Sequence, residues 1–95
     1  MEKVEKLLKD IISGIVDNKE AVEIFTSINK DERGDITILN IKVDKNDIGI
    51  CIGRNGETAE AVRRVIGLFG FQTTGKRIYV KIDAPKIYKN HFETF

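Results

Sequence analysis

The sequence predicts an α+β domain in which helices cover one face of a three-stranded sheet. Three observations lead to this prediction. Three segments carry helical spacing or helix-start signals, three others alternate apolar and polar residues, and the order is α-β-β-α-α-β. Helices confined to one face of a small sheet make a two-layer α+β domain. We expect one folded domain over residues 1–85 and a C-terminal tail over residues 86–95.

The first helix is expected over residues 3–16, ending near Asp17 and Asn18. Its apolar residues recur at the spacing of one helical stripe, and charged residues occupy the opposite face. Such a stripe is typical of a helix that packs on a sheet. The stripe consists of Val4, Leu7, Leu8, Ile11, Ile12 and Ile15.

Two strands are expected next, over residues 21–28 and 36–43, because apolar residues alternate in both. A polar turn over residues 29–35 separates them, which favours an antiparallel hairpin. The side chains expected on the core face are Val22, Ile24, Thr26 and Ile28 in the first strand and Leu39, Ile41 and Val43 in the second.

A short helix over residues 45–52 and a longer one over residues 57–69 should follow. Asp44 or Asn46 can cap the short helix, and Gly70 is well placed to end the long one. The apolar face of the long helix is wide. Its residues are Ala61, Val62, Val65, Ile66, Leu68 and Phe69.

A loop over residues 72–75 and a third strand over residues 76–83 complete the domain. Two intervening helices are long enough for a parallel, right-handed crossover from the second strand. Ile78, Val80 and Ile82 should face inward, and Tyr79 and Lys81 outward.

Composition narrows the function classes. The chain has 95 residues, 41% of them apolar and 33% charged, and no apolar run long enough to span a bilayer. A single cysteine builds neither a disulfide framework nor a metal cluster, so we expect a reducing cytoplasm and no cofactor. Residues 36–95 contain ten Lys and Arg against six Asp and Glu, a modest excess that suits an anionic partner.

The most informative stretch is Gly53-Arg54-Asn55-Gly56, which lies between the second and third expected helices. Its two glycines bracket one cation and one small amide. Because glycine lacks Cβ, a phosphodiester backbone can lie against the main chain at such a loop. The positive end of the following helix points at the same place. The bland alternative is a helix-to-helix turn that needs positive φ and binds nothing.

These residues resemble a known family. Ile52 and the four residues after it match the I-G-x-x-G signature of KH domains, and the element order resembles the type II arrangement of that fold. Chain length and the N-terminal helix resemble the small bacterial RNA-binding proteins called KhpA, over about residues 3–84. The resemblance implies a single-stranded RNA-binding protein that is not an enzyme, with an RNA chaperone or regulatory role.

The resemblance also implies a site and partners. About four nucleotides would be clamped between the glycine loop and an apolar groove. The partner would be RNA, together with a second copy of the chain or a second KH-containing protein of the KhpB/Jag type. Arg64 and Lys81 would guide flanking phosphate. The expected RNA-binding residues are Ile48, Ile52, Gly53, Arg54, Asn55, Gly56, Ala59, Val62 and Arg63.

Two features depart from this pattern. Glu57 and Glu60 place negative charge in the first turn of the helix that should face phosphate, and no aromatic residue adjoins the loop. The competing interpretation is a protein-interaction or ribosome-assembly module in which the glycine turn is structural.

Enzymatic constellations are absent from the sequence. Residues 70–77 nearly spell a phosphate-binding loop, but Arg77 replaces the hydroxyl residue and the stretch precedes a strand instead of a helix. Cys51 has no neighbouring base in the sequence, and His91 stands alone in the tail. Tyr88, Phe92 and Phe95 of the tail can pack a C-terminal helix, contact a partner or fray.

Overall fold

The computed structural model describes residues 1–84. Its element order is the predicted α-β-β-α-α-β arrangement of a type II KH fold. The expected tail over residues 86–95 lies outside the described residues. The elements are α1 (Glu2–Ser13), β1 (Glu23–Asp31), β2 (Gly34–Lys42), α2 (Ile48–Ile52), α3 (Glu57–Thr74) and β3 (Ile78–Ile82), with single 3₁₀ turns at Lys19–Ala21, Lys45–Asp47 and Arg54–Gly56.

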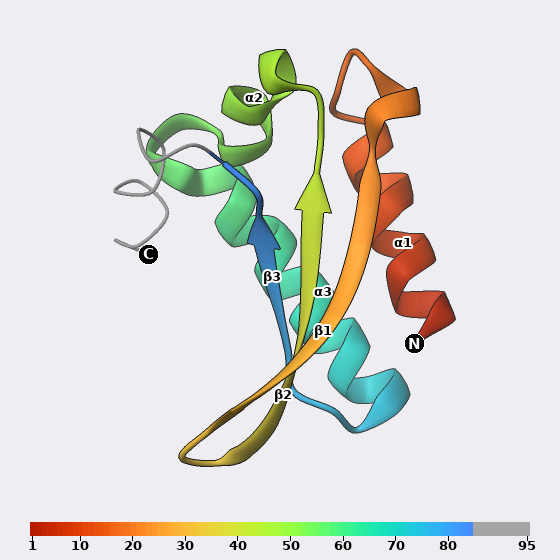
Figure 1. Cartoon of the computed structure of the whole chain (residues 1–95), viewed down its shortest axis with the longest axis vertical. Helices are drawn as coiled ribbons and strands as arrows, with labels where there is room; N and C mark the ends of the chain where they lie inside the picture. The colour runs from red at the N-terminus through yellow and green to blue at the C-terminus, as the bar shows by residue number, and fades with distance from the viewer. Residues whose placement is uncertain (85–95) are drawn as a thin grey trace.

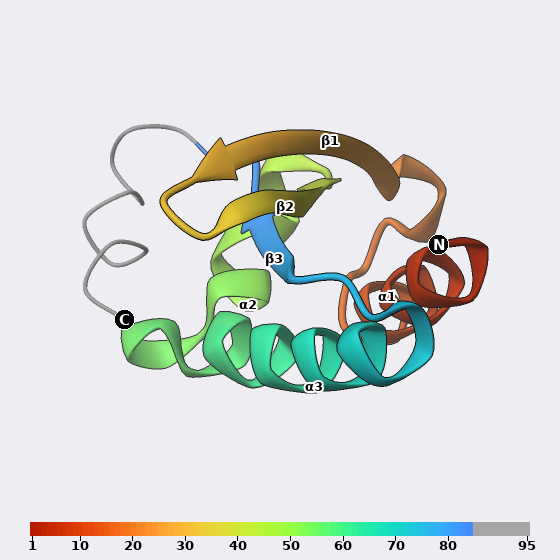
Figure 2. The same cartoon turned by 90° about the horizontal axis from the view of Figure 1, so that it is seen from below.

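The three strands form one mixed sheet in the order β1-β2-β3. Strands β1 and β2 are antiparallel, with Glu23 opposite Lys42, and β2 and β3 are parallel, with Ile41 opposite Ile82. Both pairings confirm the prediction. Helices α1 and α3 lie side by side on one face of the sheet (Figures 1 and 2). Within residues 1–84, the opposite face carries no helix, and no helix is long and apolar enough to cross a membrane.

The core lies between the sheet and these helices. The expected inward residues of β2 and β3 are buried there, except that Ile78 is partly buried. One residue on each successive turn of α1 and one face of α3 are buried in the same core. The residues with at most 2% exposure are Val4, Leu8, Ile12, Leu39, Ile41, Cys51, Ile66 and Val80. The period-two and helical patterns therefore identified the core faces of β2, β3 and α1 correctly.

The predicted end of the long helix at residue 69 is wrong. Helix α3 continues through Gly70 to Thr74 and ends at Gly75, whose φ of 73° makes it the left-handed C-cap. Gly70 is buried within the helix, where a Cβ atom would lie 2.2 Å from Cδ1 of Ile78. Gly70 is therefore a close-contact residue, and the expected loop over residues 72–75 is mostly helix.

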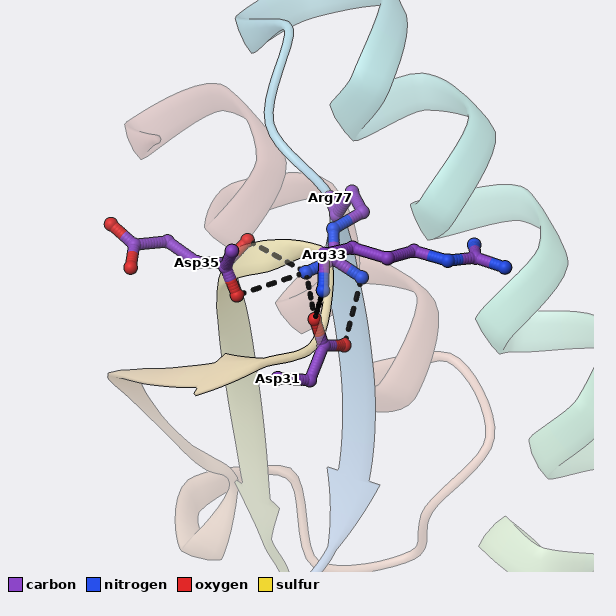
Figure 3. A network of polar contacts seen from close by, with 5 residues as sticks. Asp31, Arg33, Asp35 and Arg77 are labelled. Atoms are coloured by element: carbon purple, nitrogen blue, oxygen red, sulfur yellow. Dashed lines mark hydrogen bonds and ion pairs between the residues drawn. The ribbon is translucent and has the colours of Figure 1, made fainter.

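The predicted hairpin turn over residues 29–35 is also too long. Strand pairing continues to Asp31 opposite Gly34, which leaves a two-residue turn. The guanidinium of Arg77 fixes this turn by donating to both carboxylate oxygens of Asp31, at 2.8 and 2.6 Å, and to the carbonyls of Gly34 and Asp35, at 3.1 Å (Figure 3). The Arg77 hydrogen bonds, followed by the backbone N–H of Arg33, lower the pKa of Asp31 to about 2.

The start of the chain also differs from expectation. Helix α1 ends at Ser13, before the predicted residue 16, and β1 begins at Glu23 instead of residue 21. Ile28 shares the inner side of the sheet with its partner Thr37 but remains 64% exposed. The hairpin end of the sheet extends past α1 and α3 (Figure 1). Ile28 lies on the edge strand β1 and stays exposed there, whereas Thr37 on the central strand β2 is 5% exposed.

Candidate nucleic-acid interface

The backbone of the Gly53–Gly56 loop turns sharply between α2 and α3. Gly53 adopts φ 78° and ψ 174°, Asn55 adopts φ 53° and ψ 23°, and Gly56 adopts φ 78° and ψ 10°. The conformation of Gly53 is open essentially to glycine alone. Left-handed conformations like the other two suit glycine and asparagine. The local sequence therefore explains the loop conformation residue by residue.

Packing imposes a second requirement for glycine at position 53. A Cβ atom there would lie 2.3 Å from Oγ1 of Thr58 and 2.8 Å from the Thr58 backbone nitrogen. The first turn of α3 therefore lies directly against the start of the loop. The Gly56 N–H also donates to the Gly53 carbonyl at 3.1 Å, which closes the turn.

Helix α2, which leads into the loop, is anchored by two acidic residues. Asp44 caps the preceding 3₁₀ turn, as predicted, by accepting from the Asn46 N–H at 2.9 Å. Asp47 is 3% exposed, and its two oxygens accept from the backbone N–H groups of Asp17 and Asn18, each at 3.1 Å. Sequence reasoning missed the role of Asp47, since its partners lie about thirty residues away along the chain.

The charges around the loop favour an anion more than the sequence indicated. Arg54 is exposed and forms no ion pair with any residue in the described part of the chain. Glu60 pairs with Arg64 at 3.2 Å, so part of its charge is compensated. No side chain caps the N-terminus of α3, which leaves its first N–H groups facing the loop without a side-chain acceptor.

The four apolar residues expected to line a groove are core residues. Their exposed fractions are 5% for Ile48, 3% for Ile52, 3% for Ala59 and 6% for Val62. They support the loop from beneath and offer little surface. The exposed apolar residue of α2 is Ile50, at 52%, which sequence reasoning did not select.

A shallow hollow of about 300 Å³ lies beside α2. Ile48 forms part of its wall, together with the ends of β2 and β3. Of the predicted groove residues, only Ile48 lines this hollow. Its lining residues are Lys42, Val43, Lys45, Ile48, Asp83 and Ala84.

Arg63, also expected in the site, reaches the edge strand of the sheet. Its Nε donates to the Val80 carbonyl at 2.9 Å, and its guanidinium carbon lies 4.9 Å from the centre of the Tyr79 ring. Arg63 therefore covers the outer edge of β3, whereas Arg54 is an exposed residue of the loop itself.

Cys51, in the middle of α2, is fully buried. Burial, with a smaller contribution from the charge of Asp47, raises the pKa of its thiol to about 11. The thiol is therefore protonated at neutral pH and acts as a small core side chain.

Comparison with known proteins agrees with this architecture. The family described as KhpA/KhpB, KH domain, matches residues 5–82. The chain is 37% identical over 67 residues to the RNA-binding protein KhpA of Streptomyces coelicolor, covering 70% of this chain and 80% of the relative. It is 34% identical over 80 residues to that of Oceanobacillus iheyensis, covering 83% and 99%.

A solved structure shares the fold. The crystal structure of a variant of Aquifex aeolicus Era bound to GDP·AlF4⁻ superimposes with a TM-score of 0.63 at 14% identity. The match covers 95% of this chain and 35% of that one, so it concerns the fold alone. With its element order, its glycine loop between two helices and a family match over most of its length, the chain belongs to the KhpA/KhpB family of KH domains.

Proposed function

We propose that this protein binds single-stranded RNA through the Gly53–Gly56 loop and catalyses no reaction. The observation that carries the proposal is the backbone of the loop, which has three residues at positive φ between two helices. The glycine N–H groups donate within the chain, Gly53 to the Gly49 carbonyl at 2.9 Å and Gly56 to the Gly53 carbonyl at 3.1 Å. The loop therefore offers a phosphodiester the close approach that glycine permits and the exposed residues Arg54 and Asn55. The relatives named RNA-binding protein KhpA support the RNA-binding part of the proposal.

Phosphate recognition falls to the loop itself. Arg54 supplies a charge-assisted contact, Asn55 a neutral donor, and the uncapped start of α3 its N–H groups and positive dipole end. Glu57 opposes this attraction, while Glu60 is partly compensated by Arg64. One cation opposed by a nearby carboxylate predicts modest affinity.

Base recognition falls to the adjacent surface. We place about four nucleotides along α2 and α3, the length that a KH domain clamps. Ile50 is the exposed apolar side chain there, and Arg63 forms the rim at β3. The floor beneath the bases consists of Ile48, Ile52, Ala59 and Val62.

Family membership also supports a proposal about the cellular role. We place residues 1–85 in the cytoplasm as an RNA chaperone or regulator, associated with a second copy or with a KhpB/Jag-like protein. Val65, Leu68 and Phe71 support association, because they are 51%, 66% and 54% exposed on α3. A dimer would present two modest RNA sites at once and raise their effective concentration.

The test is the double variant Arg54→Asp/Asn55→Asp, with RNA affinity measured by fluorescence anisotropy. Aspartate tolerates the left-handed backbone at position 55, so folding should be retained. Repulsion of phosphate should weaken binding at least about tenfold. For the parent chain, the logarithm of affinity against the logarithm of salt concentration should have the slope of about two to four phosphate contacts.

A matched control changes the same total charge elsewhere. Asn29→Asp/Arg33→Asp alters one amide and one arginine at the exposed hairpin, far along the sheet from the loop. RNA affinity should change little in this control. Equal affinity of both double variants would instead favour the protein-interaction or ribosome-assembly module, in which the glycine turn is structural.

A further inference from the structure

The face of the sheet opposite the helices carries two exposed aromatic rings. Phe25 on β1 is 52% exposed and Tyr79 on β3 is 38% exposed. Their neighbours along the strands, such as Ile24 and Val80, point toward the helices, so the rings point away from them. Figure 2 shows that α1 and α3 both lie on the other side of the sheet. Within residues 1–84, no element covers this outer face.

Strand register arranges polar groups around these rings. Phe25 lies opposite Asn40, and Asn40 opposite Lys81, so the three form one row across the sheet. Tyr79 lies in the next row, opposite Ile38. From strand spacing and rise, the backbone positions of the two rings are about 12 Å apart. The rings are therefore separate platforms, each able to stack one planar group.

Cations border the same surface. A hollow of about 230 Å³ is lined by Phe25, Asn40, Lys42, Lys81 and Asp83, with Ile41 beneath. Two lysines and one carboxylate thus line the hollow, and a second carboxylate, that of Glu23, lies opposite Lys42 in the strand register. The amide of Asn40 donates to the Phe25 carbonyl and to Oγ of Ser27, both at 3.1 Å, which holds it beside the ring.

The outer face is also connected to the loop side of the molecule. Strand β3 is the edge of the sheet, and Arg63 reaches it from α3. Its guanidinium both contacts the Val80 carbonyl and lies over the Tyr79 ring. A cation therefore sits on the path from the α2–α3 surface, around the edge of β3, to the outer face.

We propose that the outer face, defined as Phe25, Ile38, Asn40, Lys42, Tyr79 and Lys81, is a second contact surface for single-stranded RNA. Phe25 and Tyr79 stack bases, and Lys42 and Lys81 contact phosphates. The proposal rests on the proposed function, since it extends the path of an RNA held at the Gly53–Gly56 loop. Aromatic rings beside cations fit any base sequence. Lysine is depleted at the centre of protein–protein interfaces, so its presence here favours RNA over protein.

The first experiment compares RNA lengths. Affinity is measured for an oligonucleotide of about four nucleotides, which one groove accommodates, and for one of about twelve. Phe25→Ala/Lys81→Ala should weaken binding of the longer RNA about tenfold and leave the shorter one unchanged. For the longer RNA, Lys81→Ala alone should reduce the slope of the logarithm of affinity against the logarithm of salt concentration by the equivalent of about one phosphate contact. Ile28→Ala is the control, since Ile28 is an exposed apolar residue on β1, like Phe25, but lies on the inner side of the sheet.

The outcomes separate the two proposals. In one outcome, Phe25→Ala/Lys81→Ala binds the longer RNA as tightly as the parent chain, and Arg54→Asp/Asn55→Asp binds both lengths more weakly. That outcome would overturn the outer-face site and keep the loop site. Weakening by the outer-face variant with a silent loop variant would support the outer face and refute the loop.

A second experiment reports contact directly. The chain contains no tryptophan, so Phe25→Trp introduces a single indole on the outer face. Stacked bases should quench its fluorescence with the same midpoint as binding of the longer RNA. Phe71→Trp is the control because Phe71 on α3 is 54% exposed, close to the 52% of Phe25. Quenching absent from Phe25→Trp, or equal in both variants, would refute stacking there and leave the face to another partner.

Discussion

Gly53 and Thr58 are in such close contact that a Cβ atom on Gly53 would lie 2.3 Å from the Thr58 hydroxyl oxygen. The Thr58 backbone nitrogen would also lie at 2.8 Å, so a side-chain rotation alone cannot make room. Position 53 therefore needs glycine for two independent reasons, its backbone conformation and its neighbour.

Gly53→Ala should destabilise the fold by about 1–3 kcal/mol through backbone strain alone, with the Thr58 clash added. RNA affinity should fall together with stability. Gly49→Ala is the matched control in α2, because a Cβ there meets no atom within 4 Å. That change should be neutral or stabilise by up to about 1 kcal/mol. Urea unfolding checks both, and equal stability of the two variants would contradict the argument.

Asp47→Ala should lower the free energy of unfolding by about 2–3 kcal/mol, since it deprives the Asp17 and Asn18 N–H groups of a charged acceptor. Asp47→Asn keeps one acceptor oxygen and should lower the free energy of unfolding by a smaller amount. Chemical denaturation provides the measurement. If both variants matched the parent chain, the link between the end of α1 and the start of α2 would not contribute to stability.

The Asp31–Arg77 pair should make stability depend on pH. The pKa of Asp31 falls from 3.8 to about 2 in the folded chain, so folding favours the carboxylate. The stabilisation is complete above about pH 4 and is lost as the pH falls toward 2. The thermal midpoint of Asp31→Asn should lie below that of the parent at pH 6, and the difference should vanish near pH 2.

Asp35→Asn is the control for that titration. Arg77 contacts the backbone carbonyl of Asp35 and not its carboxylate, so this change keeps the contact (Figure 3). If Asp35→Asn lowered the thermal midpoint with the same pH dependence as Asp31→Asn, the loss of one negative charge, and not of the Asp31–Arg77 pair, would be responsible.

Gly70→Ala should destabilise the chain by about 1–2 kcal/mol even though alanine favours helices, because the new Cβ meets Cδ1 of Ile78 at 2.2 Å. In an Ile78→Val background, which lacks Cδ1 but keeps Cγ1 at 3.2 Å from the new Cβ, the same substitution should cost less. A double-mutant cycle of thermal unfolding measures this coupling. Additive effects would mean that the helix accommodates the methyl group in another way.

Leu68→Glu should weaken self-association about tenfold or more, since an exposed apolar side chain of α3 would become a charge that must be desolvated on pairing. Sedimentation equilibrium measures the association constant. Ile28→Glu places the same charge at a residue of similar exposure on β1 and should have no effect. A parent chain that stays monomeric at every concentration would remove this part of the proposal.

Several features were predictable from local rules. Element order, the inward residues Leu39, Ile41 and Val43, the Asp44 cap and the glycine loop all depend on spacing or on one residue's own conformational preference. The end of α3 was not predictable in this way. Gly70 looks like a helix end in the sequence, but it lies inside α3, where Ile78 occupies the space that a side chain would need.

The same distinction between local rules and tertiary contacts applies to the candidate site. Sequence was enough to single out Gly53, Arg54, Asn55 and Gly56, since glycine spacing and positive φ are local properties. Tertiary structure alone decided that Ile48 and its apolar neighbours are almost fully buried and that Arg63 covers the edge of β3. It also decided that Phe25 and Tyr79 stay exposed on the uncovered side of the sheet. The physical reason is that periodicity fixes the direction of a side chain, whereas burial depends on which distant segment packs against it.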